Sequence, residues 1–166
     1  MKLESLHELY IHELHDLYSA EEQIIKALPK MIQSAESSEL RSALQTHLEE
    51  TRGHVTRLEE VFRMHNEDAK GEKCKGMEGI INEGKDVVKH KENPSVRDTG
   101  IIAGAQKVEH YEIAGYGSVR TWAAQMGHVV AAELLQQTLD EEKQADKILT
   151  QLAQSLNVQA AHRAGQ

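Results

Sequence analysis

Four long segments of this sequence repeat apolar residues every three or four positions, which is the spacing of one face of an α-helix. They run over residues 3–34, 39–66, 96–125 and 129–156. The 166 residues include only two prolines and one phenylalanine, whereas the strong helix formers Ala, Leu, Glu, Lys and Gln are abundant. The sequence therefore predicts an all-α fold built mainly from four long helices.

The connections between these segments differ in length, and the difference predicts how the helices are joined. Short joints link the first segment to the second and the third to the fourth, whereas about 30 residues separate the second from the third. A short helix around residues 80–89 is expected there. A ferritin-like four-helix bundle has one such long crossover, which an up-and-down bundle lacks. We expect a single ferritin-like domain over residues 1–158, with a frayed tail over residues 159–166.

The charge and hydropathy patterns argue against several classes of protein. The formal net charge is −8, and the basic residues form no cluster of the kind that a nucleic-acid-binding surface shows. No apolar run is long enough to span a membrane, and the chain opens with an amphipathic helix pattern rather than a signal peptide. The single cysteine, Cys74, cannot form an intrachain disulfide. We therefore expect a cytoplasmic protein that binds neither nucleic acid nor membrane.

Acidic and histidine side chains interrupt the apolar face of every long segment. At about 100° per residue, Glu109 and Glu112 share a helical face with Tyr116, whereas His110 between them points away. A carboxylate without a partner is rarely buried, because desolvating its charge is costly. The same construction on all four segments gives the inward candidates for metal ligation: Glu21, Glu50, His54, Glu109, Glu112, Glu142 and Asp146.

These residues approach, but do not match, the ligand pattern of di-iron carboxylate proteins. That pattern has a lone Glu on two helices and Glu-x-x-His on the other two. The pairs here are Glu50-x-x-x-His54 and Glu142-x-x-x-Asp146, so which member of each pair binds a metal stays open. Any one inward Glu could be an edge residue whose stem packs while its carboxylate reaches water. Acids at matching depth on all four helices instead favour a dinuclear site.

The donor types indicate which metals such a site would take. Carboxylate oxygens suit hard divalent ions, and several carboxylates offset the charge of two neighbouring cations. We expect two metal ions, with Fe favoured and Mn as the alternative. His12 and His15 are also spaced to bind a transition metal, but a solvated helix face is the favoured interpretation for that pair.

The sequence also resembles the YciE/YciF family of ferritin-like proteins over nearly its whole length. The segments that carry the resemblance are LYIHELHDLYSAEEQIIKALPKM, HLEETRGHVTRLEEVF, AQKVEHYEIAGYGSVRTWA and LLQQTLDEEKQADKILTQLA. The resemblance implies a four-helix ferritin-like fold, a homodimer, a bacterial cytoplasmic setting and a link to stress responses. It also implies a rubrerythrin-like dinuclear site with an additional Glu on the third long helix, which would be Glu109.

Three functions follow as hypotheses from these observations. The leading one is a di-metal carboxylate protein that oxidises Fe(II) with peroxide or oxygen under stress. Cys74 alone cannot form the cysteine pairs of a built-in electron-transfer centre, so the oxidant and reductant would be external and are not identified by the sequence. The second is a non-enzymatic stress or interaction protein with a structural or vestigial metal site. The third, iron storage, requires a closed shell, whereas we expect a dimer.

Overall fold

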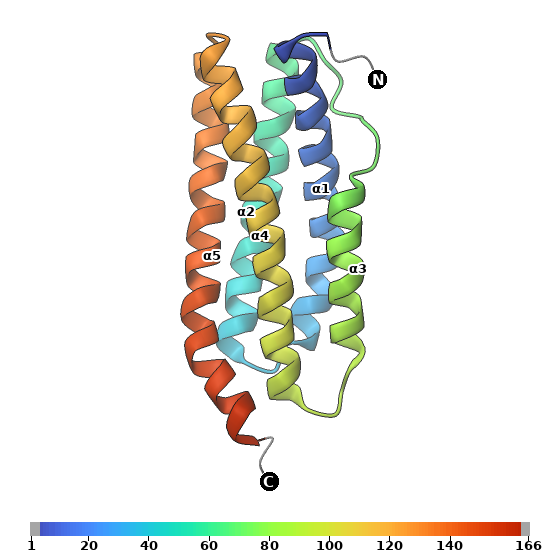
Figure 1. Ribbon diagram of the computed structural model, residues 1–166, viewed down its shortest axis with the longest axis vertical. Coiled ribbons are helices and arrows are strands. Elements are labelled where there is room, and N and C mark those ends of the chain that lie inside the picture. Colours follow the sequence, from blue (N-terminus) through green and yellow to red (C-terminus); the bar gives the residue numbers. More distant parts are fainter. Residues whose placement is uncertain (1–3, 164–166) are drawn as a thin grey trace.

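The chain folds entirely into helices over the residues that the structure, a computed structural model, describes. These are residues 4–163, which contain five α-helices and no strand. Each long helix contacts two others, in the order α1, α2, α5, α4 and back to α1, while the shorter α3 packs against α1 and α4 (Figure 1). The expected all-α class is confirmed. The helices are α1 (Leu6–Ser34), α2 (Ser38–Met64), α3 (Lys75–Lys89), α4 (Pro94–Gln125) and α5 (Val129–Arg163).

Side-chain caps explain where several of these helices begin. Ser5 accepts a hydrogen bond from the N–H of Glu8, and the Glu8 carboxylate accepts one from the N–H of Ser5 in return. Ser37 caps α2 through the Leu40 N–H, and Asn93 caps α4 just before the proline that opens that helix. Local sequence thus determines these three starts.

The start of α3 differs from the expectation. The helix begins at Lys75, five residues before residue 80, and is capped by Cys74, whose Sγ accepts a hydrogen bond from the Met77 N–H at 3.3 Å. Cysteine is not among the usual capping residues, and the flanking glycines and lysines read as a loop. Burial of Met77, which is fully enclosed, supplies the tertiary contact that extends the helix toward its N-terminus.

The end of α5 also lies beyond the expected position. The helix continues to Arg163, so residues 159–163 are helical where a frayed tail was expected, and residues 164–166 lie outside the described part of the chain. Burial of Ala160 and the strong helix propensity of Gln and Ala account for the extension. Among the described residues, no helix combines the length and hydropathy that crossing a membrane requires.

The core consists of two apolar clusters with a polar layer between them. One cluster contains Tyr10, Leu58 and Leu135, and the other contains Ile24 and Leu149. On each long helix, buried acidic or histidine residues occupy the stretch between the two clusters: Glu21 on α1, His54 on α2, Glu109 and Glu112 on α4, and Glu142 on α5. The fold therefore brings residues from all four long helices to one level of the core.

Candidate metal centre

Five of the seven residues expected from the sequence meet in this polar layer, and all five are at most 1% exposed. Together with His47 they form two overlapping groups, and within each group one ligand atom from each residue lies within 4.8 Å of the others. One group contains Glu21, His54 and Glu142, and the other contains His47, Glu109, Glu112 and Glu142. Glu142 belongs to both groups, so it links them into one cluster.

The ligand atoms of this cluster lie close together, but most of them form no hydrogen bond. His54 Nδ1 lies 2.9 Å from a Glu142 oxygen and 3.2 Å from a Glu21 oxygen, yet neither contact has hydrogen-bond geometry. Both carboxylate oxygens of Glu112 and of Glu142 lack a hydrogen-bond partner among the described residues. Buried polar atoms are normally hydrogen-bonded, so orphaned oxygens packed this closely are typical of ligands for a cation.

Two other polar groups hold this cluster in place from outside. The other nitrogen of His54, Nε2, lies 2.9 Å from a Glu141 oxygen, and Arg57 binds both oxygens of Glu141 at 2.6 and 2.8 Å. Because a carboxylate only accepts hydrogen bonds, Nε2 is the donor in this contact, and Nδ1 is the nitrogen that would bind a metal once its proton is lost, as in carboxylate–histidine–metal arrangements. The buried Tyr116 hydroxyl donates to Glu21 at 2.5 Å.

Sequence reasoning missed His47 and Glu141. His47 is 6% exposed, its Nε2 lies 3.4 Å from a Glu109 oxygen, and both of its nitrogens lack hydrogen-bond partners in the described part of the chain. The signal for His47 was its spacing of seven residues from His54, which places both on one helical face. Glu141 is half-exposed, and its partner Arg57 lies on another helix, so the sequence carried no signal for that contact.

The pKa values follow from burying several carboxyls together. Burial raises the pKa of Glu109 and Glu112 well above the ordinary value of 4.5. Burial opposes ionisation of Glu142 too, but the protons on nearby Glu109 and His54 stabilise its carboxylate and lower its pKa to about 2. Burial alone would lower the pKa of His54, yet the nearby carboxylates of Glu21 and Glu142 raise it to about 10. Protons thus supply the positive charge that the cluster requires.

The structure does not bring Glu50 and Asp146 into either group. Glu50 is half-buried beside the cluster. Asp146 accepts a hydrogen bond from Gln106 at 3.2 Å and lies 3.3 Å from His110 Nε2. The His110 side chain is 69% exposed, whereas Glu112 is fully buried, so the helical phase expected for α4 is confirmed.

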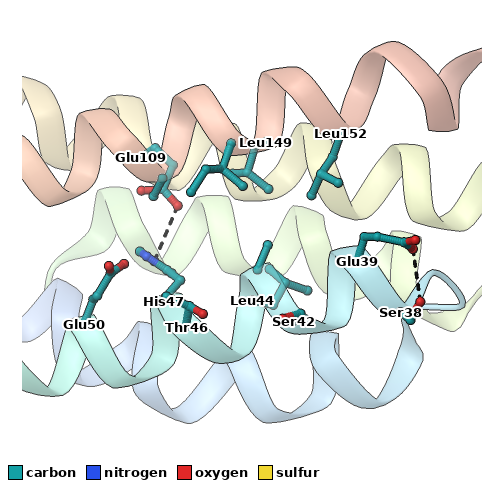
Figure 2. Close-up of a pocket in the computed structure, with 13 residues that line it drawn as sticks. Ser38, Glu39, Ser42, Leu44, Thr46, His47, Glu50, Glu109, Leu149 and Leu152 are labelled. Atoms are coloured by element: carbon teal, nitrogen blue, oxygen red, sulfur yellow. Dashed lines mark hydrogen bonds and ion pairs between the residues drawn. The ribbon is translucent and has the colours of Figure 1, made fainter.

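A groove between α2 and α5 leads to the cluster (Figure 2). It has a volume of about 500 Å³. Leu44, Leu149 and Leu152 line its apolar part, and His47, Glu50 and Glu109 lie together at one end (Figure 2). Since two of these three polar residues belong to the cluster, the groove offers small molecules and ions a route to otherwise buried ligands.

Comparison with known proteins assigns the family. Residues 5–162 match the family described as domain of unknown function DUF892. The chain is 43% identical over 166 residues to YciF of Escherichia coli, covering 99% of this chain and all of the relative. The crystal structure of that organism's stress protein YciF superposes with a TM-score of 0.89 at 44% identity, covering 93% of this chain and 98% of that one.

Two further structures show the same architecture. YcfI from Rhodopseudomonas palustris has a TM-score of 0.87 at 40% identity and covers 90% of this chain and 95% of its own. A protein from Xanthomonas campestris, at 17% identity and a TM-score of 0.78, shares the fold over 98% of this chain and all of its own. The chain therefore belongs to the DUF892 family and is a relative of the YciF protein of Escherichia coli.

Proposed function

We propose that this chain is a ferritin-like, dinuclear metal-binding protein that oxidises Fe(II) under stress. The observation that carries the proposal is a set of buried ligand atoms without hydrogen-bond partners among the described residues: carboxylate oxygens from α1, α4 and α5, and histidine nitrogens from α2. Such an arrangement is costly in a metal-free core, since buried charges are tolerated only when they are paired or bind a cation. Two divalent ions would remove that cost.

The donor set fits iron, with manganese as the alternative. Carboxylate oxygens favour hard ions, and the imidazoles of His47 and His54 add borderline donors that suit Fe(II). His54 would bind through Nδ1, because Glu141 already occupies its Nε2. Glu142, common to both groups, would be a ligand of the site. Glu50, at the end of the groove beside His47 and Glu109, is a further ligand in our proposed set, whereas Asp146 accepts a hydrogen bond from Gln106 and lies outside it.

The chain's own residues would prepare the site for redox chemistry. Bound iron would supply electron transfer to peroxide or oxygen. The two apolar clusters exclude bulk water from the ligands on either side. Burial holds the pKa of Glu109 well above its ordinary value, so the proton that it retains in the metal-free core would be released on binding a cation. The groove between α2 and α5 would admit Fe(II) and a small oxidant, and the reductant would come from outside the chain.

Anaerobic titration with Fe(II) tests the binding. We expect two ions per chain in the natural sequence and weakened or lost binding in Glu21→Gln and Glu142→Gln, because each change removes a charged ligand. Glu22→Gln is the matched control, since Glu22 is exposed beside Glu21 on the same helix. Absence of stoichiometric binding, or equal binding in all three variants, would refute the proposal.

Adding peroxide or oxygen to the Fe(II)-loaded protein tests the chemistry. Fe(III) should appear in the natural sequence at a rate well above that of free Fe(II), and Glu142→Gln should abolish the difference. The complete enclosure of Glu21, Glu112 and Glu142 favours a second candidate, a non-enzymatic stress protein with a structural metal. Chelation that lowers the melting temperature, without any oxidation of bound Fe(II), would support that candidate instead.

A further inference from the structure

A second group of potential metal ligands lies at one end of the molecule. His7 in the first turn of α1, His65 at the end of α2 and His128 in the turn between α4 and α5 each offer a nitrogen within 4.8 Å of the others. Their ring centroids are 5.7 Å (His7–His65), 4.6 Å (His65–His128) and 6.1 Å (His7–His128) apart. The three chain segments that carry them meet at the same end in Figure 1.

Two of these histidines are held by the turns that end long helices. His65 caps α2, and its N–H donates to the Phe62 carbonyl at 3.0 Å. His128 follows Gly127, whose positive φ of 80° ends α4, and its N–H donates to the Ala123 carbonyl at 2.9 Å. Both imidazoles therefore extend from backbone that is fixed by hydrogen bonds, which is the preorganisation that a metal site needs.

Unpartnered polar atoms at this end point independently to a ligand. Tyr10 is completely buried, and its ring lies 5.3 Å from that of His65 and 6.2 Å from that of His128. Neither the Tyr10 hydroxyl nor His65 Nε2 has a hydrogen-bond partner among the described residues, although both atoms are buried. By contrast, His15 Nε2 is already bonded to the Asp68 carbonyl at 2.8 Å, so the His12–His15 pair is not equivalent.

The donor chemistry separates this group from the carboxylate cluster. It consists of three imidazoles and no carboxylate, and for such nitrogen ligands affinity generally rises from Mn²⁺ and Fe²⁺ to Ni²⁺, Cu²⁺ and Zn²⁺, whereas the carboxylates of the other cluster favour harder ions. Fourteen residues of helix separate His7 from Glu21, which is about 21 Å at 1.5 Å per residue, so no ion could be shared. Three protein nitrogens and one open position also match the ligand count of many zinc sites.

We propose that His7, His65 and His128 form a separate site for a late first-row divalent cation, Zn²⁺ above all. Tetrahedral zinc with bonds of about 2.0–2.1 Å holds its nitrogens about 3.3 Å apart, so the imidazoles must move slightly closer than they lie here. His7 is exposed in the first turn of α1, and its side chain can supply that movement without disturbing the core.

Zinc counting on the full-length, metal-stripped chain tests the proposal. The natural sequence should bind one more Zn²⁺ than His7→Ala or His128→Ala, because each variant lacks one of the three proposed ligands. Any Zn²⁺ that a variant still binds at this end should bind at least about tenfold more weakly than in the natural sequence. His90→Ala is the matched control, because His90 also caps a helix but lies at the end of α3. It should bind as many Zn²⁺ ions as the natural sequence.

Two further measurements keep the test decisive. Co²⁺ in place of Zn²⁺ should give the absorption of a tetrahedral nitrogen site, and that band should be absent from His7→Ala. His7 is exposed, so this variant is expected to fold, and its circular dichroism and Fe(II) binding should match those of the natural sequence. Equal Zn²⁺ counts and affinities in His7→Ala, His128→Ala and His90→Ala would overturn the proposal.

Discussion

His54 shows how one side chain can be prepared for a metal before any metal arrives. Its Nε2 is engaged by Glu141, which Arg57 holds through both oxygens, while its Nδ1 faces Glu21 and Glu142. Residues outside the cluster therefore fix the orientation of the His54 ring. They also determine that Nε2 is the nitrogen that would keep its proton when a metal binds. Substituting an outer residue that orients a metal ligand typically lowers metal affinity about 10- to 100-fold.

Glu141→Ala should weaken Fe(II) binding about 10- to 100-fold while leaving the number of ions per chain unchanged. The variant removes the acceptor for His54 Nε2–H but no proposed ligand. Calorimetric titration under nitrogen measures both quantities. Asp140→Ala, an exposed change on the same helix, is the control and should bind as the natural sequence does. A changed ion count in Glu141→Ala would show that Glu141 is itself a ligand.

The metal-free protein should become less stable as pH rises. Because the folded-state pKa values of Glu109 and Glu112 are raised above 4.5, their contribution is complete below that pH and is lost above it. His54, whose pKa is raised from 6.5 to about 10, loses its contribution over that interval. Burial lowers the pKa of His47, which acts in the opposite sense only below 6.5, so urea unfolding in chelator should show the free energy of unfolding falling from about pH 6.5 to pH 10.

Metal should reverse this trend, because ligands must lose their protons to bind. Mn(II), which resists oxidation, should raise the melting temperature more at about pH 8 than at about pH 5, because fewer protons have to be displaced from Glu109, Glu112 and His54 at the higher pH. Glu112→Gln cannot titrate and should flatten the pH dependence of the metal-free protein, whereas Glu22→Gln should retain it. A pH profile identical in the two variants would contradict the assignment to the buried carboxyls.

At the scale of elements, the outer helix α3 is joined to the four long helices by a close approach. A Cβ on Gly100 of α4 would lie 2.4 Å from Cγ1 of Val87 on α3. Gly104 of α4 likewise approaches Gly84 of α3, since a Cβ on Gly104 would lie 4.0 Å from the Gly84 Cα. Small residues thus set how tightly α3 packs on α4.

Gly100→Ala should destabilise the protein by about 1–3 kcal/mol, because the new methyl overpacks the α3–α4 contact. Gly79→Ala is the control, since nothing lies within 4 Å of a Cβ there. That change should stabilise α3 by about 0.5–1 kcal/mol, the difference in helix propensity. Denaturant unfolding measures both, and an equal effect of the two substitutions would show that α3 does not pack tightly at Gly100.

The sequence predicted the long helices well and the cluster only in part, for physical reasons. Periodicity located Glu21, His54, Glu109, Glu112 and Glu142, because a buried face repeats with the helix. The bounds of α3 depended on burying Met77, a tertiary contact that no local pattern contains. The contact between Glu141 and Arg57 joins two different helices, so no local sequence pattern indicates it.

At the scale of the whole molecule, two exposed apolar residues bear on assembly. Val129 and Val130, at the start of α5, are 62% and 56% exposed. Single exposed apolar side chains are normal on a protein surface, but among the described residues these two large apolar side chains are exposed next to each other in the chain. We propose that two copies of the chain associate, as the family resemblance implies, and that these two valines lie in the contact.

Light scattering on the metal-free and the metal-loaded protein should give the mass of two chains. Val129→Lys together with Val130→Lys is expected to shift the mass toward one chain if these residues lie in the contact, because two buried charges would oppose association. Val158→Lys, another exposed valine on α5, is the matched control. A mass of many chains would favour iron storage, and a mass of one chain would contradict the dimer.

The residue that caps α3 is enclosed by its neighbours. Cys74 is 1% exposed, its Sγ lies 3.1 Å from an Asp16 oxygen and 3.0 Å from the Tyr111 hydroxyl, and burial raises the pKa of the thiol. A thiol reagent can reach it only when the start of α3 detaches from α1 and α4. Cys74 is the single cysteine of the chain. The rate at which a thiol reagent labels it therefore reports how often the start of α3 opens.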